Sequence, residues 1–206
     1  MVALVLAPHT DDGEMGCGGY MVRLLDEGST VYYAAFSCAE KSVPVGWSPT
    51  VLRDEVARAT TVLGVAATHL YVYDQEVRMF PARRQEILDT LIQLREELHP
   101  SLVILPSRMD GHQDHQVVSE EGVRAFKHCS VLGYEQPWNN VQMQTDFFVP
   151  LTREQLDRKI GAIACYESQK HRPYAKPSFF ESLATVRGVQ VGVNYAEAYE
   201  VIRWVL

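Results

Sequence analysis

The chain has 206 residues, a length that favours one domain spanning residues 1–206 over two. With 47% hydrophobic and 22% charged residues its composition is that of a globular protein, which excludes disorder, collagen and coiled coils. The formal net charge of −7 argues against nucleic-acid and anionic-membrane partners, because both require a basic face. A small basic pocket for a phosphorylated substrate remains compatible with this charge.

The sequence predicts an α/β protein in which strands alternate with helices. In chain order, the first part predicts strands and helices at 2–7, 14–27, 30–37, 48–63, 69–73, 83–98, 101–105, 113–127 and 131–134. A strand at 141–149, helices at 156–165 and 179–186, and a strand or short helix at 199–205 follow. This alternation predicts a Rossmann-like, doubly wound, mostly parallel sheet with helices on both faces.

Cysteine usage and the apolar segments indicate a cellular location. The four cysteines form no CxxC pair, and the chain is too long to need a disulfide framework, so we expect reduced thiols and a cytoplasmic protein. No basic segment followed by a signal-peptide core begins the sequence, and no window of about 20 apolar residues occurs. We therefore expect no stable membrane insertion.

Acidic side chains and an imidazole directly follow the first predicted strand, at His9, Asp11 and Asp12. Ligands of doubly wound sheets bind beyond the carboxyl ends of the strands, so this loop is a candidate site. The glycine run 16–19 that follows resembles part of a dinucleotide fingerprint, but Met21 replaces the third glycine. Because the preceding carboxylates would also repel a pyrophosphate, a dehydrogenase is the least favoured function.

A second polar loop follows the predicted strand 101–105 and contains Asp110, His112, Asp114 and His115. Imidazole and carboxylate groups form catalytic zinc sites with an open position for water, and ferrous iron accepts a similar set. Helix capping by Asp12 or Asp110 would explain either loop alone. Two such loops at one edge of the sheet favour a site for a divalent metal.

These motifs are similar to those of a known family. The residues Ala7-Pro8-His9-Thr10-Asp11-Asp12, the glycine run 16–19 and His112-Gln113-Asp114-His115 resemble the PIG-L/LmbE family of zinc-dependent N-deacetylases. The resemblance extends, in the family's order, through Arg53-Asp54-Glu55, Leu63-Gly64, Tyr166-Glu167-Ser168-Gln169, Arg187-Gly188 and Tyr195-Ala196-Glu197. One position departs from the pattern: the family often has glutamate directly after the Asp pair, where this chain has Gly13 and then Glu14.

The resemblance implies an LmbE-like fold and a role for each matching residue. His9, Asp12 and His115 would bind zinc, and Asp11 would be the general base. His112, when protonated, would support the tetrahedral intermediate and the leaving amine.

Two further residues and a reaction also follow from the resemblance. Asp114 would orient His112 or a ligand histidine, and Arg53 would contact a substrate hydroxyl or phosphate. The implied reaction removes the N-acetyl group from an N-acetylated amino sugar, such as N-acetylglucosamine or a conjugate of it, and releases acetate and a free amine. A homo-oligomer is implied as well.

Two alternative functions stay open on the sequence. A metal-dependent amidase acting on a larger acyl group or a thiol conjugate would keep the site and change the bond that breaks. A non-catalytic sugar- or metal-binding module would need neither Asp11 nor His112, so the presence of both argues against it. Aromatic residues such as Trp47, Trp138 and Tyr134 could stack on a sugar ring or belong to the core.

Overall fold

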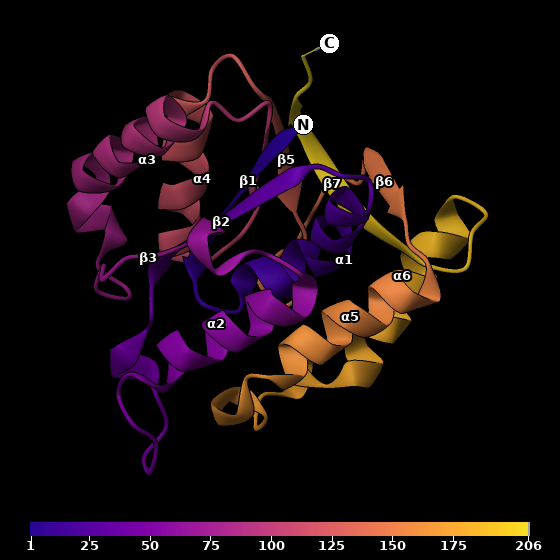
Figure 1. Cartoon of the computed structure of the whole chain (residues 1–206), viewed down its shortest axis with the longest axis horizontal. Helices are drawn as coiled ribbons and strands as arrows, with labels where there is room; N and C mark the ends of the chain where they lie inside the picture. The colour runs from indigo at the N-terminus through magenta and orange to yellow at the C-terminus, as the bar shows by residue number, and fades with distance from the viewer. Residues whose placement is uncertain (206) are drawn as a thin grey trace.

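The computed structural model describes residues 1–205, which are built around one mixed sheet (Figure 1). The strand order in these residues is β3-β2-β1-β4-β5-β7-β6. The strands are β1 (Val2–His9), β2 (Thr30–Ser37), β3 (Leu70–Val72), β4 (Leu102–Pro106), β5 (Ser130–Tyr134), β6 (Phe147–Pro150) and β7 (Ala196–Arg203).

The first five strands are parallel and the last two complete an antiparallel edge. β1 lies between β2 and β4, with Val5 opposite both Tyr33 and Ile104. The chain therefore continues to one side of β1 first and returns to its other side, which makes the carboxyl end of β1 the topological switch point. The predicted doubly wound, mostly parallel sheet is confirmed, and the tail predicted as strand or helix is strand β7.

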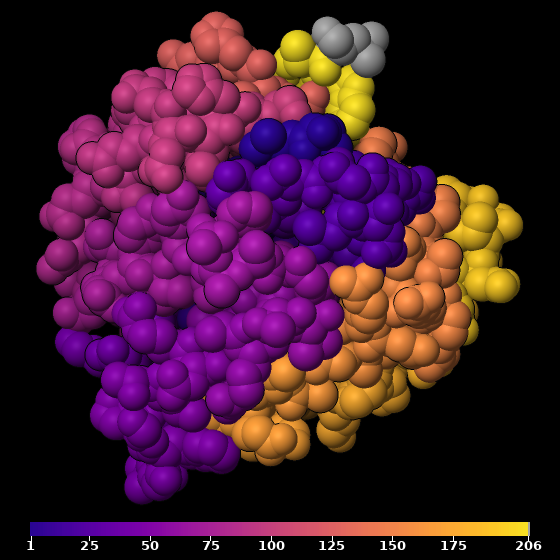
Figure 2. Space-filling view, in the orientation of Figure 1, coloured from indigo at the N-terminus to yellow at the C-terminus, as the bar shows by residue number. Residues whose placement is uncertain are grey.

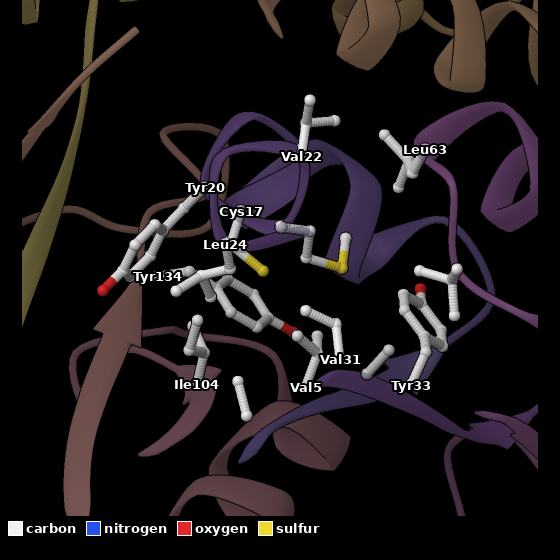
Figure 3. Packing of buried hydrophobic residues seen from close by; sticks show 14 of the residues in the cluster. Val5, Cys17, Tyr20, Val22, Leu24, Val31, Tyr33, Leu63, Ile104 and Tyr134 are labelled. Carbon is white, nitrogen blue, oxygen red and sulfur yellow. The ribbon is translucent and has the colours of Figure 1, made fainter. Parts of the chain in front are cut away.

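Helices cover both faces of the sheet (Figure 1). Within the described residues they are α1 (Asp12–Asp26), α2 (Val51–Leu63), α3 (Arg84–Leu98), α4 (Gln113–Ala125), α5 (Arg153–Ala164) and α6 (Pro177–Gln190). Alternate residues of β1 enter different cores, because successive side chains of a strand point to opposite faces. Val5 packs with residues of α1, α2 and α5, whereas Leu4 and Leu6 pack with residues of α3 and α4. Figure 3 shows part of the first core.

Segments far apart in the sequence pack directly against one another. In Figure 2 the orange segment that contains α5 lies against the purple segment that contains α2. Leu63 of α2 and Ala162 of α5 belong to the same buried cluster. Helix α5 therefore covers the same face of the sheet as α1 and α2.

Some element boundaries differ from the prediction, each for a local reason. The strand predicted at 141–149 begins only at Phe147, because the chain after β5 turns through hydrogen bonds between Gln136 and Asn140. Helix α5 begins three residues earlier than predicted, because Thr152 and Gln155 form a capping box.

Neither a disulfide nor a membrane-spanning helix occurs in the part of the chain that the structure describes, residues 1–205. All four cysteines are free thiols in the structure. Among residues 1–205, no helix combines the length and the apolar character required to cross a bilayer.

Candidate metal centre

The loops after β1 and β4 meet at the carboxyl edge of the sheet, as predicted from the strand order. They line a cavity of about 440 Å³ together with residues 136–139 after β5 and residues 169–174 between α5 and α6. Six of the predicted site residues lie in or directly behind this cavity: His9, Asp11, Asp12, His112, Asp114 and His115.

Three atoms in this cavity form a nearly equilateral triangle. Oδ2 of Asp12 lies 3.2 Å from Nδ1 of His9 and 3.2 Å from Nε2 of His115, and the two nitrogens are 3.3 Å apart. A tetrahedral zinc site with bonds of about 2.0–2.1 Å separates its ligand atoms by about 3.3–3.4 Å. The spacing of the three atoms therefore fits three corners of such a site.

Carboxylates behind the two histidines fix which ring nitrogens face the triangle. Nε2 of His9 lies 2.9 Å from Oδ2 of Asp114, and Nδ1 of His115 lies 2.8 Å from Oδ2 of Asp110. When each ring is neutral and its outer nitrogen donates a hydrogen to the carboxylate, the inner nitrogen presents a lone pair. Asp114 thus orients His9, one of the two alternatives that the sequence left open.

With both rings neutral, the triangle consists of three acceptor atoms, an arrangement that suits a cation. Burial lowers the pKa of His115, but the charges of Asp12 and Asp110 raise it to about 10 overall. Burial likewise raises the pKa of Asp12, yet His115 and His9 hold it well below its ordinary value. A proton neutralises part of the negative charge at the triangle. A divalent metal ion would also bind the lone pairs of all three atoms.

His112 is not equivalent to the other two histidines, although ring nitrogens of all three lie within 4.8 Å of one another. It is the N-cap of α4, where its Nδ1 accepts the backbone N–H of Asp114 at 3.2 Å. Burial and the neighbouring His115 and His9 lower the pKa of His112 to about 4. The neutral ring then carries its hydrogen on Nε2, so His112 can donate a hydrogen bond in the cavity.

Asp11 supplies a carboxylate that the fold itself does not use. It is the N-cap of α1 with φ 88°, a left-handed conformation that is strained for residues other than glycine. Its side chain makes no capping hydrogen bond and lines the cavity. Burial, and then the charge of Asp12, raise the pKa of Asp11 well above its ordinary value, as a general base near neutral pH requires.

Gln136 holds the carboxylate of Asp12 in the triangle, a role that the sequence did not indicate. This fully buried residue donates from Nε2 to Oδ1 of Asp12 at 2.9 Å, while its Oε1 accepts from Asn139. Oδ1 of Asp12 is thereby occupied and Oδ2 is left for the triangle. The only signal in the sequence was the Pro/Asn-rich turn after a strand that ends at the same edge of the sheet.

The structure explains the departure at Gly13. A Cβ atom at this position would lie 2.4 Å from the ring of Tyr33, so the close approach of that ring requires glycine. Tyr33 donates to one oxygen of Glu14, and Tyr166 donates to the other at 2.7 Å. Burial raises the pKa of Glu14 to about 7. Through these two hydrogen bonds the buried Glu14 links α1 to β2 and to the segment after α5.

The glycine run likewise has a structural role. Helix α1 departs from helical geometry at Cys17, and the carboxylate of Glu197 accepts the backbone N–H groups of Gly19 and Tyr20 at 2.9 and 2.8 Å. Lys159 pairs with the same carboxylate at 2.6 Å. A buried protein carboxylate thus occupies the backbone N–H groups at the end of the run, at Gly19 and Tyr20.

Arg53 is the one predicted site residue that the structure does not bring to the cavity. Its guanidinium forms an ion pair with the exposed Asp74 at the start of the loop after β3, and it is not among the lining residues. The sequence placed Arg53 at the correct edge of the sheet, but a nearby carboxylate turns the side chain outward. The basic residue that does line the cavity is Arg172.

Of the aromatic residues considered from the sequence, Trp138 alone lines this cavity. Its indole stacks on Tyr174 with ring centroids 4.2 Å apart and an interplanar angle of 7°. Tyr134 is buried beneath the site and donates to the carbonyl of Leu6, whereas Trp47 is exposed. The stacked rings of Trp138, from the loop after β5, and Tyr174, from the segment between α5 and α6, therefore both line the cavity.

Comparisons with known proteins agree with this geometry. The model of the family described as PIG-L, GlcNAc-PI de-N-acetylase, matches residues 4–126, which include both histidine-containing loops. The chain is 26% identical over 220 residues to the diacetylchitobiose deacetylase of Thermococcus kodakarensis, across 94% of this chain and 80% of that protein.

Solved structures show the same fold. The conserved protein TT1542 from Thermus thermophilus superposes with a TM-score of 0.81 at 26% identity, across 99% of this chain and 95% of that one. GalB, the 4-carboxy-2-hydroxymuconate hydratase of Pseudomonas putida, also reaches a TM-score of 0.81, at 20% identity, across 100% of this chain and 97% of that one. Since a hydratase shares the fold, the fold alone does not determine the reaction.

Proposed function

Because the chain belongs to the PIG-L, or GlcNAc-PI de-N-acetylase, family, we propose that it is a metal-dependent N-deacetylase acting on an N-acetylated amino sugar or its conjugate. One observation carries the proposal: the triangle of His9, Asp12 and His115 opens into the same cavity as the free carboxylate of Asp11 and the ring of His112.

In this proposal His9, Asp12 and His115 hold the metal ion. Two imidazoles and one carboxylate suit zinc (Zn2+) with an open position, and ferrous iron is the alternative. When bound, such an ion supplies Lewis acidity to an amide carbonyl and lowers the pKa of water to about 7.

Asp11 and His112 then handle the proton and the charge of the reaction. The Asp11 carboxylate takes a proton from water as the water oxygen attacks the acetamide carbon. The Nε2–H of His112 donates a hydrogen bond to the oxygen that becomes negative. When the C–N bond breaks, the amine nitrogen takes the proton from Asp11, and acetate leaves. The proposal thus uses a neutral His112 in place of the protonated ring expected from the sequence, and the lowered pKa of that ring and its accepting Nδ1 support this choice.

The carboxylates behind the histidines are expected to contribute to metal affinity. Asp110→Asn and Asp114→Asn should each weaken binding about 10- to 100-fold, because each loses a charged partner that orients a ligand and raises its basicity. Competition with a chromogenic chelator measures the effect. Asp89→Asn, a change in an exposed aspartate of α3, is the control and should bind metal like the wild type. Unchanged affinity in both site variants would contradict the assigned orientation of the rings.

Metal content paired with acetate release tests the function itself. We expect about one zinc or iron per chain and chelator-sensitive release of acetate from N-acetylglucosamine or its conjugates. Metal without acetate would direct attention to other amides, including larger acyl groups and thiol conjugates. Absence of metal after reconstitution would overturn the hydrolase proposal and revive a non-catalytic sugar-binding module.

Substrate, location and assembly are the finer parts of the proposal. The relatives named above support an acetylated sugar as substrate. Acetate release from a series of N-acetylated sugars and their conjugates would identify the sugar and its carrier. A cytoplasmic location and a homo-oligomer stay predictions from the sequence.

A further inference from the structure

We propose that Arg172 is a specificity-determining residue that binds an anionic group of the substrate, a carboxylate or a phosphate, beside the amide to be hydrolysed. The inference rests on the proposed deacetylase function and adds to it the charge of the substrate. It is carried by the position of Arg172, by its partners and by the neighbouring polar atoms.

Arg172 lies in the segment between the short turns Glu167–Gln169 and Pro173–Ala175, and its half-buried side chain lines the same cavity as Asp11 and Asp12. It is the only lysine or arginine among the lining residues, in a chain of net charge −7. A positive charge in this cavity is therefore a local feature and does not follow from a generally basic surface.

The protein gives Arg172 no counter-ion at contact distance. Within residues 1–205, no carboxylate oxygen lies within 4.0 Å of its guanidinium, whereas Arg53, Arg108 and Arg187 each pair with an acidic residue. Its assigned donor bond is from Nη1 to the hydroxyl of Tyr174. A guanidinium has five N–H donors, so donors remain for a planar or tetrahedral anion, which arginine binds in a bidentate manner.

The direction of the guanidinium is fixed by its neighbours. Tyr174 accepts the hydrogen bond from Arg172 and stacks on Trp138, which in turn contacts Phe179 and Phe180. Arginine loses less conformational entropy on binding when such a contact already restrains it. Arg172 is thus held ready in the cavity before any ligand arrives.

Two buried polar atoms in the same cavity also lack partners within residues 1–205. Among these residues, Oε1 of Gln169 and Oγ1 of Thr10 find no hydrogen-bond partner, although both side chains are only 1% exposed and both residues line the cavity. Nε2 of Gln169 is committed to Ser168, which leaves Oε1 as an acceptor. Buried polar atoms are normally satisfied, so these two fit the hydroxyl groups of a sugar whose anionic substituent reaches Arg172.

Matched substrates test the proposal. Deacetylation of N-acetylglucosamine is compared with that of its 1-phosphate and 6-phosphate and with that of N-acetylmuramic acid, so that the phosphate and carboxylate arms are separate. We expect kcat/KM for at least one charged sugar to exceed that for N-acetylglucosamine about 10-fold or more. Arg172→Met should lose about 10- to 100-fold on that sugar and less than about 3-fold on the neutral one. Arg172→Lys should recover part of the loss as a point charge.

Controls separate this role from a structural one. Arg83→Met, at an exposed arginine paired with Glu86, should leave both rates unchanged, and thermal unfolding confirms that each variant folds. Equal losses on charged and neutral sugars in Arg172→Met would overturn the proposal. Arg172 would then act on the charge of Asp11, and the pH profile of kcat/KM would shift in the variant. No preference for any charged sugar in the wild type would overturn it as well.

Calorimetric binding of the free amines distinguishes this failure from failure of the proposed function. Glucosamine 6-phosphate, glucosamine 1-phosphate, muramic acid and glucosamine are each titrated into the wild type and Arg172→Met. Binding of a charged amine that requires Arg172, without any acetate release, would sink the deacetylase function and keep the anion site. Turnover of N-acetylglucosamine without a preference for charged sugars would support the deacetylase function and overturn the anion site.

Discussion

Replacing His115 with alanine is expected to remove the metal and to lower kcat/KM for acetate release by about 10³-fold or more. The variant takes away Nε2, one corner of the triangle with Asp12 and His9, and leaves only two ligand atoms. It also leaves Asp110 without the ring that its Oδ2 contacts. Metal analysis of the dialysed protein, together with an acetate assay, measures both losses, which should occur together.

Two comparisons make this result specific to the ligand set. His128→Ala changes an exposed histidine outside the cavity and should keep both metal and activity. His112→Ala should keep the metal and lose turnover, because His112 faces the cavity as a donor. Loss of metal from His112→Ala with retention in Asp12→Asn would show that the three histidines form the ligand set instead.

The meeting of the candidate metal and catalytic residues in one cavity could be predicted because it follows from strand order. β1 and β4 are continuous apolar runs, and parallel strands place their carboxyl ends at one edge, so His9 and His115 had to meet. The proposed division of these residues into metal ligands and a general base came from the resemblance to a family. The same reasoning placed Arg53 at the correct edge of the sheet. It did not predict the direction of the side chain, which depends on an ion pair with Asp74, 21 residues further along the chain.

Residues that surround this centre were hidden because their roles depend on contacts between segments far apart in the sequence. Gln136 reaches Asp12 across 124 positions, and Arg172 reaches the cavity from an irregular segment without a periodic pattern. The tautomer of His112 was also beyond prediction, because it depends on a backbone N–H two residues away in a cap of particular geometry. Hydrogen-bond geometry, and not residue type, decides these roles.

Asp11→Asn is expected to keep the metal and to lower kcat about 10²- to 10⁴-fold, the usual contribution of a general base. The side chain of Asp11 makes no capping hydrogen bond, so its charge is not needed for the fold. Asparagine also tolerates the left-handed backbone at φ 88°, so the substitution adds no strain. Thermal unfolding of the variant should therefore match that of the wild type.

The pH profile provides a second readout for Asp11. The base acts only as a carboxylate, so wild-type kcat/KM should rise with pH through the pKa of Asp11, which burial and Asp12 raise well above its ordinary value. Asp11→Asn removes that titration, and its residual activity should lose the acidic limb. If Asp11→Asn instead released the metal while Asp12→Asn retained it, the two adjacent carboxylates would exchange roles. The geometry opposes that exchange, because Oδ2 of Asp12, and not the side chain of Asp11, lies 3.2 Å from both histidine nitrogens.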